Sequence, residues 1–305
     1  MTKAEQMRQA FANMAFGDQI IRMPVAPDAL AAKIAETSGA DAIFAAGYAT
    51  SASNLAMPDR GLADFGIMLD KCRQIINAVN IPVFADADTG YGDLDNVART
   101  VASYEQIGAA GIFLEDQTWP KRCGHMANKA VEKTDVLVAK IKRAVATRKN
   151  KNFLIMSRTD ARAVYDLDEA IARSRQYQAA GADLVFIEAP QSRDELEQIH
   201  AAFPDTPLMA NMIEGGKTPL TTNEDLQRLG FRIVVYPTAM TYATTFAEEA
   251  LMATMMSTGS TATFTDRMVT FDRFNQFVGL DDINATEANY APEKMRKFLT
   301  ATMPH

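Results

Sequence analysis

The chain has 305 residues, of which 48% are apolar and 23% are charged, the proportions of an ordinary globular protein with a sizeable core. Its formal net charge of -7 argues against a general nucleic-acid or anionic-membrane surface, because such surfaces need an excess of Lys and Arg. Two cysteines are too few for a disulfide framework, and neither a signal-peptide core nor an apolar run of about 18 residues is present, which favours a reduced, cytosolic compartment.

Short apolar runs alternate with amphipathic segments along most of the chain. The runs predicted to be strands cover residues 20–25, 42–47, 81–86, 111–115, 153–158, 184–188, 207–211 and 233–237. The segments predicted to be helices after them cover residues 29–38, 67–79, 94–107, 134–148, 167–180, 193–203, 223–229 and 241–257. A Ser/Thr-rich loop that includes Pro58 and Asp59 is expected after the second run. The apolar runs do not alternate with polar residues, which is typical of strands covered on both faces.

Eight such repeats predict a (β/α)8 barrel, also called a TIM barrel, of the α/β class. Helix-ending glycines precede three of the predicted strands, at Gly39, Gly108 and Gly181, and this internal repeat supports the same fold. A doubly wound open sheet is the alternative. It would need a Gly-rich phosphate loop after an early strand, and the sequence has none.

Further segments are expected at both ends of the barrel. Residues 2–13 predict a short helix that packs on one end of it. We expect a single barrel domain over residues 1–305, with residues 258–305 as a C-terminal helical extension that includes a terminal helix over 291–300. Because this extension exceeds what a minimal barrel needs, we expect it to pack on a neighbouring subunit.

Polar or small residues end most of the predicted strands. In a barrel the carboxyl ends of the strands meet at one mouth, where the active site lies. We therefore expect these residues to gather around one site. They are Gly47, Asp86, Asp88, Glu115, Asp116, Arg158, Asp160, Glu188 and Asn211.

The carboxylates among these residues indicate a metal site. Asp86 and Asp88 lie two apart at a strand end, so their side chains emerge on one face and can bind a hard cation through oxygen. Mg²⁺ is the expected ion, with Glu115 and Glu188 holding its water molecules. The alternative is that Asp88 begins a turn, but carboxylates at three strand ends favour the metal. Zn²⁺ is disfavoured because only His125 offers an imidazole here.

The segment Lys121-Arg122-Cys123-Gly124-His125 concentrates two cations, a cysteine and a histidine after the fourth strand. Neighbouring cations stabilise a thiolate, which makes Cys123 a candidate proton donor and acceptor, or a nucleophile. The alternative for a lone cysteine is a small buried apolar residue. We assign that structural role to Cys72, which lies inside a predicted helix.

For two other cations, Arg158 and Lys217, the sequence also allows a role outside the site. Arg158 can bind a carboxylate through two parallel hydrogen bonds, but an ion pair with Asp160 or Glu188 is an equal alternative. Lys217 lies in a glycine-rich segment and is either part of the site or solvated surface.

Six motifs together resemble the isocitrate lyase and phosphoenolpyruvate mutase superfamily over residues 26–241. They are Pro58-Asp59-x-Gly61, Asp86-Ala87-Asp88-Thr89-Gly90-Tyr91-Gly92, Glu115-Asp116-Gln117, Lys121-Arg122-Cys123-Gly124-His125, Ser157-Arg158-Thr159-Asp160-Ala161 and Asn211-Met212-Ile213-Glu214-Gly215-Gly216-Lys217-Thr218-Pro219. Several long matches in the same order are far more specific than any one of them. The resemblance implies a homotetramer in which the last helix crosses to a partner, acting on small α-hydroxy or α-keto dicarboxylates, with no nucleic-acid or membrane partner.

The resemblance also implies roles for single residues. The residues that match the Mg²⁺ site, for which Mn²⁺ is the alternative ion, are Asp59, Asp86, Asp88 and Glu115. Cys123 matches the residue that protonates the departing carbanion, on a loop that closes over the substrate. The other catalytic candidates are Lys121, His125, Arg158 and Glu115. The residues that match substrate-binding positions are Ala46, Gly47, Tyr48, Gly124, Arg158, Glu188 and Asn211.

The loop sequence resembles the C–C bond lyases of the superfamily, because the phosphorus-transferring branch has a different loop without the cysteine. Residues 211–219 are more similar to the 2,3-dimethylmalate lyase branch and related oxaloacetate-acting enzymes than to 2-methylisocitrate lyases, in which an arginine often replaces Met126. Ala46, Tyr48 and the segment Pro24-Val25-Ala26-Pro27-Asp28 depart from the family pattern at the expected carboxylate-binding mouth.

These observations predict a Mg²⁺-dependent lyase that cleaves a 2-hydroxy dicarboxylate to a 2-oxo acid, such as pyruvate, and a second carboxylate. Breaking a C–C bond beside a tertiary alcohol needs a metal, a base and an acid, and residues of all three types are present. An oxaloacetate hydrolase or decarboxylase at the same site is the alternative enzyme. A barrel that binds a dicarboxylate without catalysis is the alternative of another class; Cys123 disfavours it, and Ala46 and Tyr48 keep it open.

Overall fold

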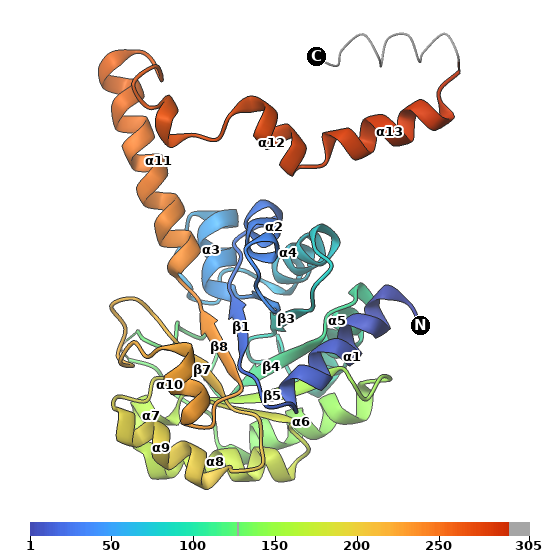
Figure 1. Ribbon diagram of the computed structural model, residues 1–305. Coiled ribbons are helices and arrows are strands. Elements are labelled where there is room, and N and C mark those ends of the chain that lie inside the picture. The colour runs from blue at the N-terminus through green and yellow to red at the C-terminus, as the bar shows by residue number, and fades with distance from the viewer. Residues whose placement is uncertain (127, 293–305) are drawn as a thin grey trace. The chain divides into compact units, whose positions relative to one another are not determined.

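The structure is a computed structural model that describes residues 1–126 and 128–292 (Figure 1). Its strands are β1 (Ile21–Pro24), β2 (Ile43–Ala45), β3 (Val83–Asp86), β4 (Gly111–Glu115), β5 (Leu154–Thr159), β6 (Leu184–Ile187), β7 (Met209–Asn211) and β8 (Ile233–Tyr236). Its helices are α1 (Lys3–Ala15), α2 (Ala29–Thr37), α3 (Gly47–Leu55), α4 (Phe65–Ala78), α5 (Leu94–Ile107), α6 (Thr134–Thr147), α7 (Ala161–Val164), α8 (Leu167–Ala179), α9 (Arg193–Ala202), α10 (Asn223–Arg228), α11 (Ala239–Thr258), η1 (Thr265–Arg267), α12 (Phe271–Phe277) and α13 (Leu280–Tyr290).

The strands are parallel and form a closed ring. One run of paired strands has the order β2-β3-β4-β5-β6 and the other has the order β1-β8-β7. Single parallel bridges join the two runs, from Val25 to Phe44 after β1 and from Val185 to Leu208 before β7. Helices such as α6, α8 and α9 lie outside the strands (Figure 1). The predicted (β/α)8 barrel is confirmed, and the doubly wound sheet is excluded.

Side chains that point into the ring form one apolar cluster. The ring centroids of Phe44 and Phe113 lie 5.7 Å apart, and those of Phe113 and Phe186 lie 6.3 Å apart. Phe11 of α1 stacks on Phe84 at 5.2 Å, and Arg8 Nε donates to the carbonyl of Ala109, just before β4. Helix α1 therefore covers the N-terminal end of the barrel, and the site lies at the opposite end.

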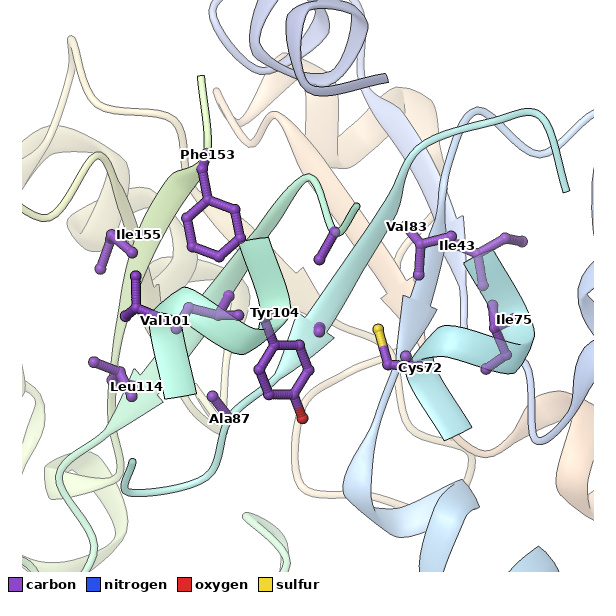
Figure 2. Packing of buried hydrophobic residues seen from close by; sticks show 14 of the residues in the cluster. Ile43, Cys72, Ile75, Val83, Ala87, Val101, Tyr104, Leu114, Phe153 and Ile155 are labelled. Atoms are coloured by element: carbon purple, nitrogen blue, oxygen red, sulfur yellow. The ribbon is translucent and has the colours of Figure 1, made fainter. Parts of the chain in front are cut away.

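Side chains that point out of the ring pack against the surrounding helices. Figure 2 shows part of this layer, in which the strand residues Ile43 and Val83 lie near Ile75 of α4, and Tyr104 of α5 lies near Ala87. Cys72 belongs to the same layer and is only 1% exposed, which confirms its predicted structural role. Because both faces of each strand are buried, the strand sequences show no alternation of apolar and polar residues.

The main difference from the predicted elements follows β2. The strand ends at Ala45, and the Ser/Thr-rich stretch expected to be a loop begins with helix α3. Thr50 N donates to the carbonyl of Ala46 to start the helix, and the small side chains of Ala49 and Ser51 are buried. Small residues with modest helix propensity form a helix here because tertiary packing of their buried face outweighs local preference.

The chain divides into two compact units, Met1–Thr244 and the part from Thr245 onward, and helix α11 spans the division. The second unit contains η1, α12 and α13. The predicted helix over residues 291–300 lies, from 293 onward, outside the described residues. None of the helices that the structure describes combines the length and the apolar character of a membrane span.

Candidate active site

The site follows from the period of two along each strand. Phe113 and Glu115 are two residues apart in β4, and Phe186 and Glu188 have the same relation at the end of β6. Alternate residues of a strand point the same way, so the polar residue at the strand end shares the inward face with the aromatic residue before it. The other pairs with this spacing are Phe44 with Ala46, Phe84 with Asp86, Met156 with Arg158, and Met209 with Asn211.

These side chains surround a cavity of about 220 Å³ at the carboxyl ends of the strands. The predicted site residues that line it are Ala46, Tyr48, Asp59, Asp86, Cys123, Gly124, His125, Arg158 and Asn211. The remaining predicted residues each contact one of these; they are Gly47, Asp88, Glu115, Lys121 and Glu188. The structure therefore brings together all of the residues to which the family resemblance gave a metal, catalytic or substrate-binding role, whereas Asp116, also expected at the site from its strand end, lies outside the cavity lining.

Lys121 lies among the carboxylates. Its Nζ is 2.7 Å from Oδ1 of Asp59 and 2.7 Å from Oδ1 of Asp88, and all three side chains are buried. Burial alone would lower the pKa of Lys121, but the charges of Asp88, Asp59 and Asp86 raise it well above the ordinary value. Lys121 therefore stays charged and neutralises part of the buried negative charge.

Asp86 is held in place by two backbone donors. Its Oδ2 accepts from the N–H of Gly47 at 2.9 Å, and its Oδ1 accepts from the N–H of Asp88 at 2.8 Å. A Cβ at position 47 would lie 3.0 Å from Asp86 Oδ2 and 3.1 Å from Lys121 Nζ. Position 47 therefore requires glycine for close approach, which gives a physical reason for its place in the site.

The carboxylate cluster carries more negative charge than its neighbouring cations balance. Burial raises the pKa of Asp88 to about 7 against the opposing charge of Lys121, and it raises the pKa of Glu115 well above the ordinary value. Glu115 Oε1 is buried and has no hydrogen-bond partner among the described residues. Both observations indicate negative charge that the protein's own cations do not fully balance.

The arrangement of the acidic side chains indicates how the site would bind a metal ion. Within the described part of the chain, no three or more His, Cys, Asp or Glu side chains converge closely enough to ligate one ion directly. Asp59 and Asp88 each direct one oxygen at Lys121 instead. Oxygen ligands that contribute few direct bonds fit a hard ion such as Mg²⁺, which keeps several of its waters.

Arg158 is surrounded by acidic side chains. Its Nε lies 3.0 Å from Asp160 Oδ2 and 3.6 Å from Glu188 Oε2, and its Nη1 lies 3.3 Å from Glu115 Oε2. The guanidinium also lines the cavity. The ion pairs considered from the sequence are thus present together with exposure to the cavity, so the two readings of Arg158 do not exclude each other.

The Cys123 loop lies between residues 117 and 131 and follows β4, and its residues from Cys123 to Met126 line the cavity. A bridge between Gln117 and Val131 joins the two ends of the loop. Farther along, His125 Nε2 lies 2.9 Å from Oε1 of Glu188, and His125 Nδ1 accepts from the backbone N–H of Lys217 at 2.9 Å. Since Nδ1 accepts, the ring proton lies on Nε2, the nitrogen that faces the Glu188 carboxylate.

Two other predicted residues meet around this contact. Asn211 Nδ2 donates to both oxygens of Glu188, at 3.3 and 3.4 Å. Burial alone would raise the pKa of Glu188, but Arg158 and His125 hold it below the ordinary value. The Lys217 side chain is exposed, and its backbone N–H is the group that contacts the site. This supports the alternative that the Lys217 side chain is solvated surface.

The predicted thiolate at Cys123 is wrong. Burial raises the pKa of the Cys123 thiol to about 11, although the backbone N–H of His125 acts in the opposite direction. The ammonium of Lys121, expected beside the sulfur, is instead directed at Asp59 and Asp88. The thiol is therefore protonated at neutral pH, which suits a proton donor and not a nucleophile.

Asp116 also differs from its sequence reading, because it faces away from the cavity. Its Oδ2 accepts from Thr159 Oγ1 at 2.6 Å and from Tyr177 OH at 3.0 Å, and its Oδ1 accepts from the N–H of Asp160 at 2.9 Å. It sits one residue beyond Glu115 and so takes the opposite face. Asp116 supports the end of β5 from outside.

Sequence reasoning missed three kinds of residue at the site. The first is the apolar wall of Phe44, Phe113 and Phe186, which the sequence could have predicted because each lies two residues before a predicted site residue. The second is Tyr242, whose hydroxyl lies 3.1 Å from that of Tyr48, and the third is Lys129, which is 2.6 Å from Asp160. No feature of the sequence predicts either contact, because the two residues of each pair are far apart along the chain.

A closed ring of eight parallel strands with buried catalytic-type side chains at its carboxyl ends defines a (β/α)8-barrel enzyme. The chain belongs to the phosphoenolpyruvate phosphomutase family, whose model matches residues 11–256. The expected superfamily is thereby confirmed.

Three curated relatives show the range of the family. The chain is 44% identical to the 2,3-dimethylmalate lyase of Eubacterium barkeri, with 95% of this chain and 99% of that protein covered. It is 43% identical to the chloroplastic carboxyvinyl-carboxyphosphonate phosphorylmutase of Arabidopsis thaliana, over 89% of this chain and 81% of that protein. It is 40% identical to the probable 2-methylisocitrate lyase 1 of Corynebacterium glutamicum, over 91% of this chain and 90% of that protein.

Three solved structures share the fold. Oxaloacetate acetylhydrolase in complex with the inhibitor 3,3-difluorooxalacetate has a TM-score of 0.89 at 31% identity, covering 95% of this chain and 98% of that one. A 2,3-dimethylmalate lyase has a TM-score of 0.88 at 33% identity, covering 95% and 96%. Phosphonopyruvate hydrolase in complex with oxalate and Mg²⁺ has a TM-score of 0.85 at 28% identity, covering 96% and 100%.

Proposed function

We propose that the protein is a divalent-cation-dependent C–C lyase that cleaves a 2-hydroxy dicarboxylate, of the 2,3-dimethylmalate kind, to a 2-oxo acid such as pyruvate and a second carboxylate. The observation that carries this proposal is the position of Cys123, which lines one cavity together with Asp86 and Arg158. The 44% identity to a 2,3-dimethylmalate lyase over nearly the whole of both chains supports it.

Two different groups at the cavity remove and donate protons in the proposed reaction. A carboxylate of the buried cluster takes the proton of the 2-hydroxyl, the C2–C3 bond breaks, and its electron pair goes to C3. The Cys123 thiol then gives its proton to C3, and before the next turnover the carboxylate releases its proton to solvent and the thiolate takes one up from solvent. A proton donor with a high pKa suits this step because a carbanion beside a carboxylate is a strong base.

The residues that would hold the cation are Asp86, Asp88, Asp59 and Glu115, some of them through water. Mg²⁺ is the ion named in the phosphonopyruvate hydrolase complex, and Mn²⁺ is the alternative. When bound, the cation would stabilise the negative oxygen of the forming 2-oxo acid. Gly47 and Lys121 support this role by fixing the directions of the Asp86 and Asp59 carboxylates.

The remaining lining residues favour a substrate with two carboxylates and an alkyl group. Arg158 offers one buried guanidinium for a carboxylate, and Met126 stands at the mouth where a cation for a third carboxylate would be needed. Phe186, Met209 and Ile213 form an apolar wall that accommodates an alkyl substituent. A tricarboxylate would place an unpaired charge against these side chains, at a high cost in desolvation.

Oxaloacetate hydrolysis or decarboxylation at the same site is the second candidate function. The likeness to oxaloacetate acetylhydrolase, at a TM-score of 0.89, favours it. A barrel that binds dicarboxylates without catalysis is less well supported, because the buried carboxylates carry a cost in stability that simple binding of a dianion does not need.

A substrate panel tests these functions. We would incubate the protein with 2-alkylmalates, 2-methylisocitrate, isocitrate and oxaloacetate, with Mg²⁺ or with EDTA, and measure the release or loss of 2-oxo acid. We expect Mg²⁺-dependent pyruvate release from 2,3-dimethylmalate and at least about tenfold lower kcat/KM on the tricarboxylates. Turnover of oxaloacetate alone would replace the lyase with the second function. No turnover and no metal dependence would leave only the binding function.

For the assembly, we propose a homotetramer in which the C-terminal segment, residues 258–305, packs on another subunit. Large apolar side chains exposed in this segment support it, with Phe271 82% and Tyr290 85% exposed. Light scattering at micromolar concentration tests it, and a monomer would contradict it.

A further inference from the structure

Lys129 is buried although it lies in a loop. Its side chain is 2% exposed, and its Nζ lies 2.6 Å from Oδ1 of Asp160. The same Nζ donates to the backbone carbonyl of Gly124, between Cys123 and His125. A buried ammonium is costly unless it is paired, so these two contacts define where this part of the loop lies.

Asp160 is a rigid anchor for this contact. Its backbone N–H donates to Asp116 Oδ1 at 2.9 Å, and Asp116 in turn accepts from Thr159 and Tyr177. Its side chain is fully buried. The position of Asp160 therefore comes from the barrel and not from the loop.

Asp160 also orients Arg158. Arg158 Nε donates to Asp160 Oδ2 at 3.0 Å, and Arg158 Nη2 donates to Asp160 Oδ1 at 3.3 Å. Oδ1 is the same oxygen that pairs with Lys129. One carboxylate thus contacts both the loop cation and the cavity guanidinium.

Gly124 of the loop lies directly against the side chains of Glu188 and Arg158. A Cβ at this position would lie 2.5 Å from Cδ of Glu188 and 2.6 Å from Nη2 of Arg158. The loop backbone therefore rests directly on these side chains, and Lys129 holds the carbonyl of that same residue. If Gly124 moves away from the cavity, Lys129 must lose its contact with either the Gly124 carbonyl or Asp160.

We propose that Lys129 is a positioning residue that fastens the Cys123 loop to Asp160, so that one carboxylate sets both the place of the Cys123 thiol and the orientation of Arg158. The effect on turnover rests on the proposed lyase function. The effect on loop position does not, and it can be measured without a substrate.

The two cysteines provide the reporter. Cys72 is 1% exposed in the core, whereas Cys123 is partly exposed and lies in the loop itself. We would alkylate the full-length protein with iodoacetamide at a single pH and follow each cysteine by peptide mass spectrometry. Opening of the loop exposes the Cys123 thiol and brings its acidity toward the ordinary value, and both effects raise its rate.

The variants are Lys129→Met, which keeps length without charge, Lys129→Arg, which restores a cation, and Lys133→Met. Lys133 is an exposed lysine close by in the sequence and serves as the matched control. We expect Lys129→Met to alkylate at Cys123 at least about tenfold faster than wild type, since it breaks a buried ion pair. We expect Lys129→Arg to recover part of the protection and Lys133→Met to match wild type.

Kinetics on the best substrate of the panel separate a positioning role from a general loss of structure. We expect Lys129→Met to lower kcat about tenfold or more while KM changes less than about threefold, because proton transfer depends on the loop and binding depends mainly on the barrel. Unchanged alkylation of Cys123 in a folded Lys129→Met protein would overturn the proposal. So would equal acceleration in Lys133→Met. Absence of turnover in wild type would instead count against the lyase function alone.

A double-mutant cycle tests the partner. If Lys129 acts through Asp160, adding Lys129→Met to Asp160→Asn accelerates Cys123 alkylation by less than about threefold beyond Asp160→Asn alone. Fully multiplicative effects in proteins that keep the wild-type far-UV circular dichroism would overturn the pairing.

Discussion

His125 Nε2 lies 2.9 Å from Oε1 of Glu188, and this contact joins the middle of the Cys123 loop to the end of β6. The other ring nitrogen accepts from the backbone of Lys217, so one imidazole connects the loop, a strand end and the segment after β7. His125 thus brings these three parts of the chain together at the cavity mouth.

Replacing His125 should loosen the loop. His125→Ala removes a close polar contact with a charged carboxylate, and contacts of this kind are worth about 1.5–3 kcal/mol, so kcat/KM should fall about 10-fold to 100-fold. The control is Lys217→Ala, which keeps the backbone N–H that His125 uses and should leave kcat/KM within about twofold of wild type. Equal losses in the two variants would contradict the role of the imidazole.

Replacing Cys123 should abolish proton transfer to the product carbanion. A hydroxyl is a far weaker acid than a thiol, so Cys123→Ser should lower kcat by about 10²-fold to 10⁴-fold with little change in substrate affinity. The matched control is Cys72→Ser, which buries a hydroxyl in the core and should lower the free energy of unfolding by about 1–3 kcal/mol while kcat of the folded protein stays unchanged. Full activity in Cys123→Ser would remove the thiol from the mechanism.

A methyl group at position 47 should disturb the carboxylate cluster. In Gly47→Ala the new Cβ would press on Asp86 Oδ2 and Lys121 Nζ, at 3.0 and 3.1 Å, so the apparent affinity for Mg²⁺ should fall about tenfold or more. Titration calorimetry with Mg²⁺ measures this directly. Gly66→Ala, in helix α4 and 3.3 Å from Asp64 Oδ1, should bind Mg²⁺ as wild type does. Wild-type affinity in Gly47→Ala would show that Asp86 does not hold the ion.

The ion pairs of Asp160 should stabilise the protein over a defined pH range. Burial alone would raise the pKa of Asp160, but Arg158 and Lys129 lower it to about 2. A folded-state pKa below the unfolded value of about 3.9 means that the stabilisation is complete above about pH 4 and is lost as the pH falls toward 2. At neutral pH it amounts to roughly 2 kcal/mol.

Urea unfolding of wild type and Asp160→Asn measures this contribution. The difference in free energy of unfolding should be constant between pH 5 and 8, as expected for a carboxylate that is ionised in both states there. It should shrink below about pH 4. A difference that changes between pH 5 and 8 would mean that Asp160 titrates near neutrality, contrary to its pairing with two cations.

Much of the fold was predictable because strand and helix periodicity is a local property. All eight strands were found within a few residues of their bounds, since each is a short run of apolar residues between helix-forming segments. Helix α3 was missed because Gly47, Ser51 and Ser53 have weak helix propensity, and only packing against the barrel decides their conformation. The positions of the candidate site residues were predictable for a related reason. Strands that lie side by side in a barrel present their last inward-facing residues to one mouth.

The sequence by itself determined the eight repeats, the strand-end residues that meet at the cavity, and the loop that carries Cys123. Only the tertiary structure decided that Lys121 pairs with Asp59 and Asp88, that Lys129 pairs with Asp160, and that the Cys123 thiol is protonated. The physical reason is that ion pairing and acidity depend on distance and on exclusion of water. Neither quantity is contained in the spacing of residues along the chain.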